Sequence, residues 1–330
     1  MESLLRQVVF SVGDEQYRWE DVVLAARHWG DWDRLKEKTA EGIACLRRLE
    51  EEDVSLTEEE VESAANEFRY ARDLVSAEEM EEWLARRSLT AEAWMEYIRS
   101  SLLRDKLSSQ TSEPVAQDPP SPEEMDRRIL AEAVFSGELD RLARRLAGLA
   151  ALDASETQPG PETEAPREAT RPRENRLEDL EDSFRRVREK ALTSGAIESA
   201  IRSSQTEWTR LACKHISFPR EEMAREAVMC IREDGTRITL VSGETQIPVL
   251  REEIYVENLE PEMRDRFLGA RAGDLLGPFT SGGEFHLYLV LDKVLPSPAD
   301  PAIVARAQEA IVNGLVEREI NDRVKWHWRY

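Results

Sequence analysis

Cysteine is scarce in this chain. Its 330 residues include only Cys45, Cys213 and Cys230, and no pair has the Cys-x-x-Cys spacing of a redox or zinc motif. Disulfide-stabilised secreted domains carry more cysteines, so we expect reduced thiols in a cytoplasmic protein. The stretch MESLLRQVVFSVGDEQYRW also lacks the basic region and long apolar run of a secretory signal.

Long apolar runs and an excess of positive charge are missing as well. No window approaches the roughly 18 apolar residues of a transmembrane helix. The 45 Lys and Arg residues are outnumbered by 67 Asp and Glu residues, which gives a formal net charge of −22. Such a surface repels phosphate groups, so we expect neither nucleic acid nor a membrane as partner. Neutral or basic polypeptides are better suited to it.

Helical periodicity dominates what is present. Apolar residues recur at intervals of three and four through residues 20–107, and Ser55 or Thr57 ahead of a run of Glu predicts a capped helix start. Two later stretches are rich in Pro, Glu, Ser and Thr, and they contain too little apolar surface to offset the entropy lost on folding.

These patterns divide the chain into seven parts. The predicted order is an N-terminal helical domain (1–107), a linker (108–121), a helical hairpin broken at Gly137 (122–152), a disordered acidic and proline-rich linker (153–175), a helix (176–206), a small α+β domain (207–297) and a C-terminal helix that packs on the N-terminal domain (298–330).

Residues 207–297 have a different composition. RLACKHISF and HLYLVLDKV are predicted strands, PREEMAREAVMCIREDG and PEMRDRFLGA are predicted helices, and TRITLVS is either a strand or a helix remnant. Gly277-Pro278 is placed in a loop that leads to His286 at the start of the last strand.

This small domain resembles the parvulin-type, PpiC-like, peptidyl-prolyl isomerases. The resemblance rests on ACKHISF and, more specifically, on AGDLLGPFTSGGEFHLYLVLDKV, with its Gly-acid turn, its Gly-Pro pair and its histidine before the final strand. It implies an α+β fold with a four-stranded, mainly antiparallel sheet. It also implies that the two histidines, His215 and His286, face each other as the catalytic pair.

The same resemblance implies an apolar proline pocket. Its residues would be Leu259, Met263 and Leu268, with Cys213 on the same strand face as His215. Rotation of an X-Pro bond needs no metal, nucleotide or covalent nucleophile, so we expect no cofactor. Cys213 and the two histidines lack a fourth ligand for zinc, so we expect no metal.

Two departures from the family pattern bear on activity. Between Gly235 and Leu259 there is no counterpart of the family's Gly-Gly-x-Leu-Gly stretch, nor of the polar Cys or Asp that stands beside the histidines. Glu284 stands where the family prefers Gly. We therefore expect isomerase activity to be weak or lost.

The flanking segments resemble the SurA-type chaperone domain. FSVGDEQYRWEDVVLAA is similar to the start of that domain and LTAEAWMEYIRSSLLRDKL to its closing helix. The favoured hypothesis is a mostly helical cytoplasmic chaperone that binds unfolded or proline-containing polypeptides. The alternatives are an active peptidyl-prolyl isomerase and a scaffold subunit of a peptide-maturation or assembly system.

Overall fold

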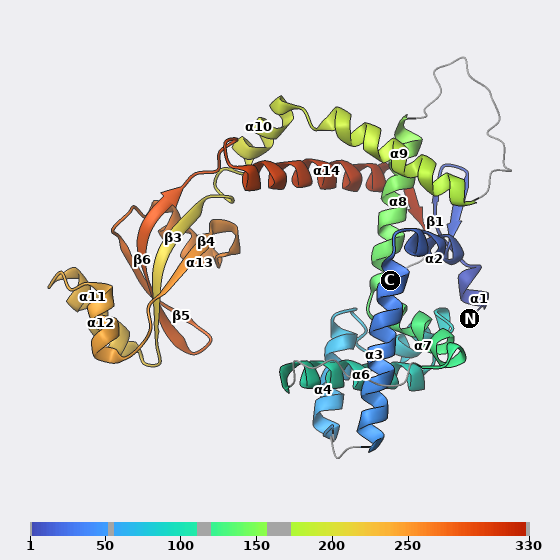
Figure 1. Ribbon diagram of the computed structural model, residues 1–330, viewed down its shortest axis with the longest axis horizontal. Helices are drawn as coiled ribbons and strands as arrows, with labels where there is room; N and C mark the ends of the chain where they lie inside the picture. Colours follow the sequence, from blue (N-terminus) through green and yellow to red (C-terminus); the bar gives the residue numbers. More distant parts are fainter. Residues whose placement is uncertain (1, 52–55, 111–119, 157–172, 328–330) are drawn as a thin grey trace. The chain divides into compact units, whose positions relative to one another are not determined.

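The computed structural model describes residues 2–51, 56–110, 120–156 and 173–327 (Figure 1). The chain forms two compact units. Unit 1 comprises Met1–Val187 and Val316–Tyr330, and unit 2 comprises Arg188–Leu315.

Unit 1 is mainly helical. Its helices are α1 (Glu2–Leu5), α2 (Trp19–His28), α3 (Asp31–Glu51), α4 (Glu58–Tyr70), α5 (Ala77–Arg86), α6 (Ala91–Gln110), α7 (Pro122–Phe135), α8 (Glu138–Glu156), most of α9 (Arg173–Ala191) and the end of α14 (Pro301–Arg323).

Several of these helices begin at side chains that the sequence marks as caps. Thr57 is the N-cap of α4, because its hydroxyl accepts the backbone N–H of Glu60 while the Glu60 carboxylate accepts the N–H of Thr57. Ser121 is the N-cap of α7, where its hydroxyl accepts the backbone N–H of Glu124, and Pro122 lies in the first turn. Gly137, with φ +76°, separates α7 from α8.

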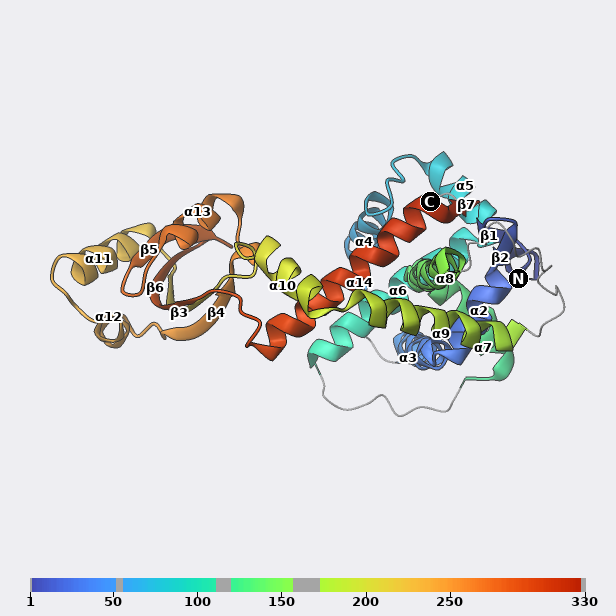
Figure 2. The ribbon, with the colours of Figure 1, turned by 90° about the horizontal axis from the view of Figure 1, so that it is seen from above.

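The core of unit 1 surrounds α8 (Figure 2). Gly148 of α8 lies so close to α14 that a Cβ atom there would be 2.7 Å from Cγ1 of Val316, so a larger residue would displace α14. A three-stranded sheet of order β2-β1-β7 completes the unit, formed by β1 (Val8–Val12), β2 (Glu15–Arg18) and β7 (Val324–Trp326).

Both predicted linkers fall largely outside the described residues. Of the segment 108–121, residues 108–110 continue α6 and Ser121 caps α7. Of the segment 153–175, residues 153–156 complete α8 and residues 173–175 begin α9. The helices therefore extend further into both segments than their composition predicts.

Unit 2 contains the small α+β domain. Its elements are α10 (Ser194–Ser203), β3 (Arg210–Phe218), α11 (Glu221–Arg232), α12 (Ile238–Thr245), β4 (Leu250–Tyr255), the 3-10 turn η1 (Val256–Asn258), α13 (Pro261–Gly269), β5 (Leu275–Ser281) and β6 (Glu284–Val294). The strands form an antiparallel sheet of order β4-β3-β6-β5. The predicted fold class, α+β and mostly helical with a four-stranded antiparallel sheet, is confirmed.

The two faces of this sheet have different partners. Ile216, Phe218 and Leu287 pack against α11 and α12, whereas Leu211 and Val290 pack with residues of α13. Because strand side chains alternate between faces, a histidine at position 215 lies on the α13 side.

Helix α14 is divided between the two units. Its first residues belong to unit 2, where Ile303 and Ala307 pack against Ile201 and Trp208. Its last residues belong to unit 1 and lead into β7, which pairs with β1.

One alternative left open by the sequence is decided, and one segment differs from the sequence prediction. TRITLVS contains the start of helix α12, because Ile238 and Val241 reach the apolar cluster on the α11 side of the sheet. The predicted Gly277-Pro278 loop is part of strand β5, which is interrupted by a bulge between Leu276 and Phe279.

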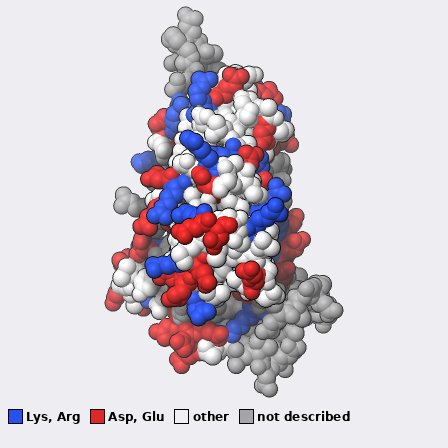
Figure 3. Space-filling model, turned by 90° about the vertical axis from the view of Figure 1, so that its left-hand side faces the viewer, with Lys and Arg blue, Asp and Glu red and all other residues white. Residues whose placement is uncertain are grey.

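Charges of both signs are interspersed on the molecular face shown in Figure 3. Among the coloured residues of that view, Lys and Arg do not form an extended basic surface, in keeping with the excess of acidic residues in the sequence.

Candidate functional site

The two predicted histidines meet on the α13 side of the four-stranded sheet. In the antiparallel register of β3 and β6, His215 is opposite Tyr288 and Ser217 is opposite His286, so the two histidines are diagonal neighbours on one face. Their ring centroids are 5.1 Å apart. Nε2 of His215 lies 2.8 Å from Nδ1 of His286, which is hydrogen-bonding distance.

A carboxylate adjoins this pair, contrary to the sequence prediction that the polar partner is missing. Oε1 of Glu252, on β4, lies 2.9 Å from Nδ1 of His215. Glu252 is opposite Cys213 in the β3–β4 register, and Cys213 precedes His215 by two residues on the same strand face. The prediction was wrong because LREEIY carries three charged residues in six and was not recognised as a strand. LREEIY has no regular alternation of apolar and polar residues, so the sequence offered little signal for this strand.

The hydrogen-bonded chain continues beyond the histidine pair. Nε2 of His286 lies 3.1 Å from the backbone carbonyl oxygen of Ser281, to which it can only donate. The three links, Glu252–His215, His215–His286 and His286–Ser281, each require one proton. The hydrogen-bonded chain therefore holds both imidazole rings in fixed orientations.

Aromatic rings surround the histidine pair. Tyr288 stacks on His215 with ring centroids 4.5 Å apart and an interplanar angle of 9°. Phe267 of α13 lies 5.3 Å from Tyr288 and 5.7 Å from Phe279, measured between centroids. Burial and the nearby Glu252 carboxylate raise the pKa of Tyr288, so its phenol stays neutral over the physiological range.

The bulge in β5 brings Phe279 into this cluster. Gly277 has φ +111°, and a Cβ atom there would be 2.5 Å from the carbonyl oxygen of His286. Only glycine allows β5 to approach β6 this closely. The Gly277-Pro278 pair singled out in the sequence therefore lies within β5, where it allows the close approach to β6 that places Phe279 in the aromatic cluster.

The predicted pocket residues lie in the same apolar cluster. Leu259, Met263 and Leu268 are partly buried and pack with Phe267 and Phe279. The structure thus brings both predicted histidines and the three predicted pocket residues to one side of the sheet.

Cys213 has a different position from the one predicted. It was expected to contact substrate, but its side chain is fully buried. Burial, with a smaller contribution from Glu252, raises the pKa of its thiol from 9.0 to about 11. The structure therefore places Cys213 as a neutral packing residue next to His215.

A cation also borders the aromatic cluster. The guanidinium carbon of the exposed Arg266 lies 5.5 Å from the ring centroid of Phe279. A cation over an aromatic face is attracted by the negative face of the ring. Arg266 was not among the predicted site residues.

Comparison with known proteins gives similarity in structure only. No family model matches the chain, and no curated protein matches it in sequence. Among solved structures, it is similar to the foldase protein PrsA of Lactococcus lactis, with 9% identity, a TM-score of 0.30 and coverage of 98% of this chain and 95% of that one. It is also similar to the foldase protein PrsA of Streptococcus pneumoniae, with 11% identity, a TM-score of 0.26 and coverage of 96% of this chain and 93% of that one.

A third similar structure is a SurA-like chaperone of Campylobacter jejuni. It has 10% identity, a TM-score of 0.20 and coverage of 98% of this chain and 100% of that one. These three structures are thus two foldases and one SurA-like chaperone. Similarity at this level carries no conclusion about activity, for which the side chains of the site are the basis.

Proposed function

We propose that this chain is a polypeptide-binding chaperone whose small α+β domain isomerises X-Pro peptide bonds. The observation that carries the proposal is the hydrogen-bonded chain from Glu252 through His215 and His286 to Ser281, set beside an apolar cluster. A proline ring requires an apolar surface, and the adjoining amide requires polar groups held in fixed directions.

The chemistry demands little more than this. The barrier to rotation about a peptide bond is roughly 18–20 kcal/mol, because amide resonance must be broken. A site accelerates rotation when it favours the twisted amide over both planar forms. Met263 and Phe279 would hold the ring, and the histidine pair would provide the polar environment of the twisted bond.

Glu252 changes the expectation for activity. Weak or lost activity was predicted because no polar partner could be found for the histidines. A carboxylate at 2.9 Å from His215 supplies one, so we propose a working isomerase in preference to a degenerate site.

The test is catalysed isomerisation of a short Xaa-Pro peptide by the full chain, measured by NMR exchange. We expect turnover by the wild-type protein and its loss in His286→Ala. The matched control is His28→Ala, which removes a partly exposed histidine on α2 of unit 1. Absence of turnover in the wild type would overturn the isomerase proposal. If aggregation of an unfolded client were still suppressed, the chain would be a holding chaperone; if neither activity were found, the scaffold alternative would apply.

A cytoplasmic location is also part of the proposal. No disulfide joins the cysteines within the described residues, and Cys213 is buried as a neutral thiol. Such cysteines suit a reducing compartment. Across the described parts of the chain, no helix combines the length and apolar character needed to cross a bilayer. Fractionation of cells that express the tagged chain would test the location.

A further inference from the structure

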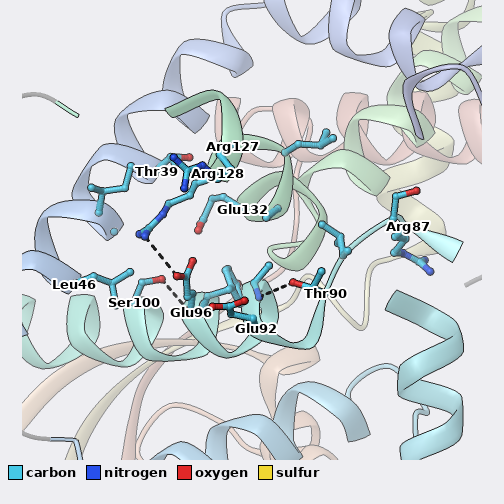
Figure 4. A pocket seen from close by; sticks show the side chains of 18 of the residues that line it. Thr39, Leu46, Arg87, Thr90, Glu92, Glu96, Ser100, Arg127, Arg128 and Glu132 are labelled. Carbon is cyan, nitrogen blue, oxygen red and sulfur yellow. Dashed lines mark hydrogen bonds and ion pairs between the residues drawn. The ribbon is translucent and has the colours of Figure 1, made fainter. Parts of the chain in front are cut away.

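A cavity of about 370 Å³ lies in unit 1, separate from the histidine pair of unit 2 (Figure 4). Its walls come from α3, from α6 with the turn that precedes it, from α7, and from Leu4 of α1. A cavity needs only about 10–15 Å³ to hold one water molecule, so this one is far larger than a packing defect. Pockets that bind ligands measure about 300–1,000 Å³.

One part of the wall is apolar. Ile43 and Leu46 come from α3, Leu89 from the turn before α6, Ala93 from α6 and Leu130 from α7. These side chains provide a surface for an apolar group but no hydrogen bonds to orient one.

The charged side chains of the wall balance one another. Three are carboxylates and three are guanidinium groups: Glu92, Glu96 and Glu132, and Arg87, Arg127 and Arg128. Their formal charges sum to zero in a chain whose net charge is −22. The lining therefore favours neither an anion nor a cation, which points to an uncharged ligand.

Some of these charges are held in place by protein partners. Glu132 is buried, and its Oε1 lies 3.2 Å from Nη2 of Arg104 and 3.5 Å from Nζ of Lys38. Arg128 of α7 reaches Glu96 of α6 at 3.6 Å, and Figure 4 shows this ion pair beside the cavity. A charged ligand would have to compete with these partners.

Glu92 and Arg127 differ, because both are exposed and neither has an ion-pair partner within the described residues. A carboxylate accepts hydrogen bonds and a guanidinium donates them. Together they match the N–H and C=O groups of a peptide backbone.

We propose that this cavity binds one neutral, apolar side chain of an extended polypeptide, while Glu92 and Arg127 contact the backbone on either side of it. The proposal rests on the proposed chaperone function, and it gives the client a second attachment point that does not involve proline. An aromatic or branched aliphatic side chain fits the apolar wall.

The test uses an acetylated and amidated seven-residue peptide without proline, in which one central Phe is flanked by Ser and Gly. Binding to the full chain is measured by calorimetry. Ala93→Leu places extra atoms in the cavity, and Gly42→Ala narrows it with little strain, since its Cβ would contact Arg104 at an ordinary 3.5 Å. The matched control is Ala91→Leu, an exposed position on the same helix outside the cavity wall.

We expect equal affinity for the wild type and Ala91→Leu, at least about a tenfold loss in Ala93→Leu, and a smaller loss in Gly42→Ala. Peptides with Glu or Lys in place of Phe should bind at least about tenfold more weakly than the Phe peptide. The proposal is overturned if the Phe peptide does not bind, if both cavity variants bind it as the wild type does, or if a charged peptide binds equally well.

Isomerisation of a short Xaa-Pro peptide is measured on the same proteins. Because the cavity lies in unit 1, its variants should leave this rate unchanged. Peptide binding without isomerisation would remove the isomerase proposal alone, and isomerisation without peptide binding would remove the cavity proposal alone.

Discussion

Glu252 is the residue that most changes the interpretation of the site. A hydrogen-bonded chain of one carboxyl group and two imidazoles fixes the direction of both rings only while each of its three links contains a proton. Glu252 closes one end of the chain at His215, and the carbonyl oxygen of Ser281 closes the other at His286. We interpret Glu252 as a positioning residue, since it would act on substrate through His215.

Removing this carboxylate should slow isomerisation. We expect Glu252→Ala to lower kcat/KM about tenfold or more, because leaving Nδ1 of the buried His215 without a hydrogen-bond partner costs roughly 1–3 kcal/mol. Glu252→Gln should stay close to wild type, because its side-chain amide still offers a hydrogen-bond partner to Nδ1 of His215. Kinetics on both variants, with nitrogen NMR of the imidazoles, check this. Full activity in Glu252→Ala would show that the carboxylate has no role.

Cys213 gives a prediction for stability at high pH. Its raised pKa means that the folded protein holds the thiol proton more tightly than the unfolded chain does. The resulting stability is complete below pH 9 and is lost as the pH rises towards about 11, to a total of about 2–3 kcal/mol. Urea unfolding between pH 8 and pH 11 should therefore show a steeper decline for the wild type than for Cys213→Ala. If the unfolding free energies of the wild type and Cys213→Ala declined equally with pH, this prediction would be wrong.

At the scale of single elements, the predictable parts of the fold were those with strong local signals. Helices with a capping side chain, such as α4 and α7, could be located from sequence because the cap and the first turn are adjacent in the chain. Strands β3 and β6 were found from their apolar residues, and these strands carry the two histidines.

The elements that were missed or left open depend on contacts distant in sequence. Helix α12 consists partly of β-branched residues, and the packing of Ile238 and Val241 outweighs their weak helix propensity. Strand β4 is an edge strand with several exposed side chains, so its apolar pattern is weak. Glu252 was overlooked for this reason, and with it the polar partner of His215.

Helix α13 supplies Met263 to the apolar cluster, and a charge there should weaken substrate binding. Met263→Glu should raise KM for a short Xaa-Pro peptide at least about tenfold, because burial of an apolar side chain contributes roughly 1.5–3 kcal/mol. The matched variant Met263→Leu conserves volume and should keep KM within about twofold. Steady-state kinetics on proteins of verified melting temperature check this. An unchanged KM in Met263→Glu would place the proline ring elsewhere.

At the scale of the whole molecule, the boundaries of unit 2 are wider than those of the α+β domain predicted from sequence. Unit 2 begins before the predicted α+β domain and ends after it. Its additional residues form a cluster in which Ile201 of α10 and Ile303 and Ala307 of α14 cover Trp208. Sequence periodicity could not assign the first half of α14 to this cluster, because an apolar stripe does not reveal which partner covers it.

Arg306 ties the same half of α14 to the sheet domain. Its guanidinium group forms an ion pair with Glu257. The guanidinium carbon, Cζ, lies 5.2 Å from the ring centroid of Trp208 and 5.4 Å from that of Tyr255. A fragment limited to residues 207–297 would leave Trp208 and Tyr255 without this cover.

We therefore expect a fragment of residues 188–315 to unfold cooperatively and to be several kcal/mol more stable than the fragment 207–297. Loss of three buried aliphatic side chains, Ile201, Ile303 and Ala307, and partial exposure of a buried Trp account for a difference of roughly 3–6 kcal/mol. Urea unfolding of the two fragments, followed by Trp fluorescence and circular dichroism, measures it. Arg306→Ala in the longer fragment separates the ion-pair and aromatic contacts of that residue from the apolar packing. Equal stability of the two fragments would mean that the first half of α14 contributes nothing to the folding of unit 2.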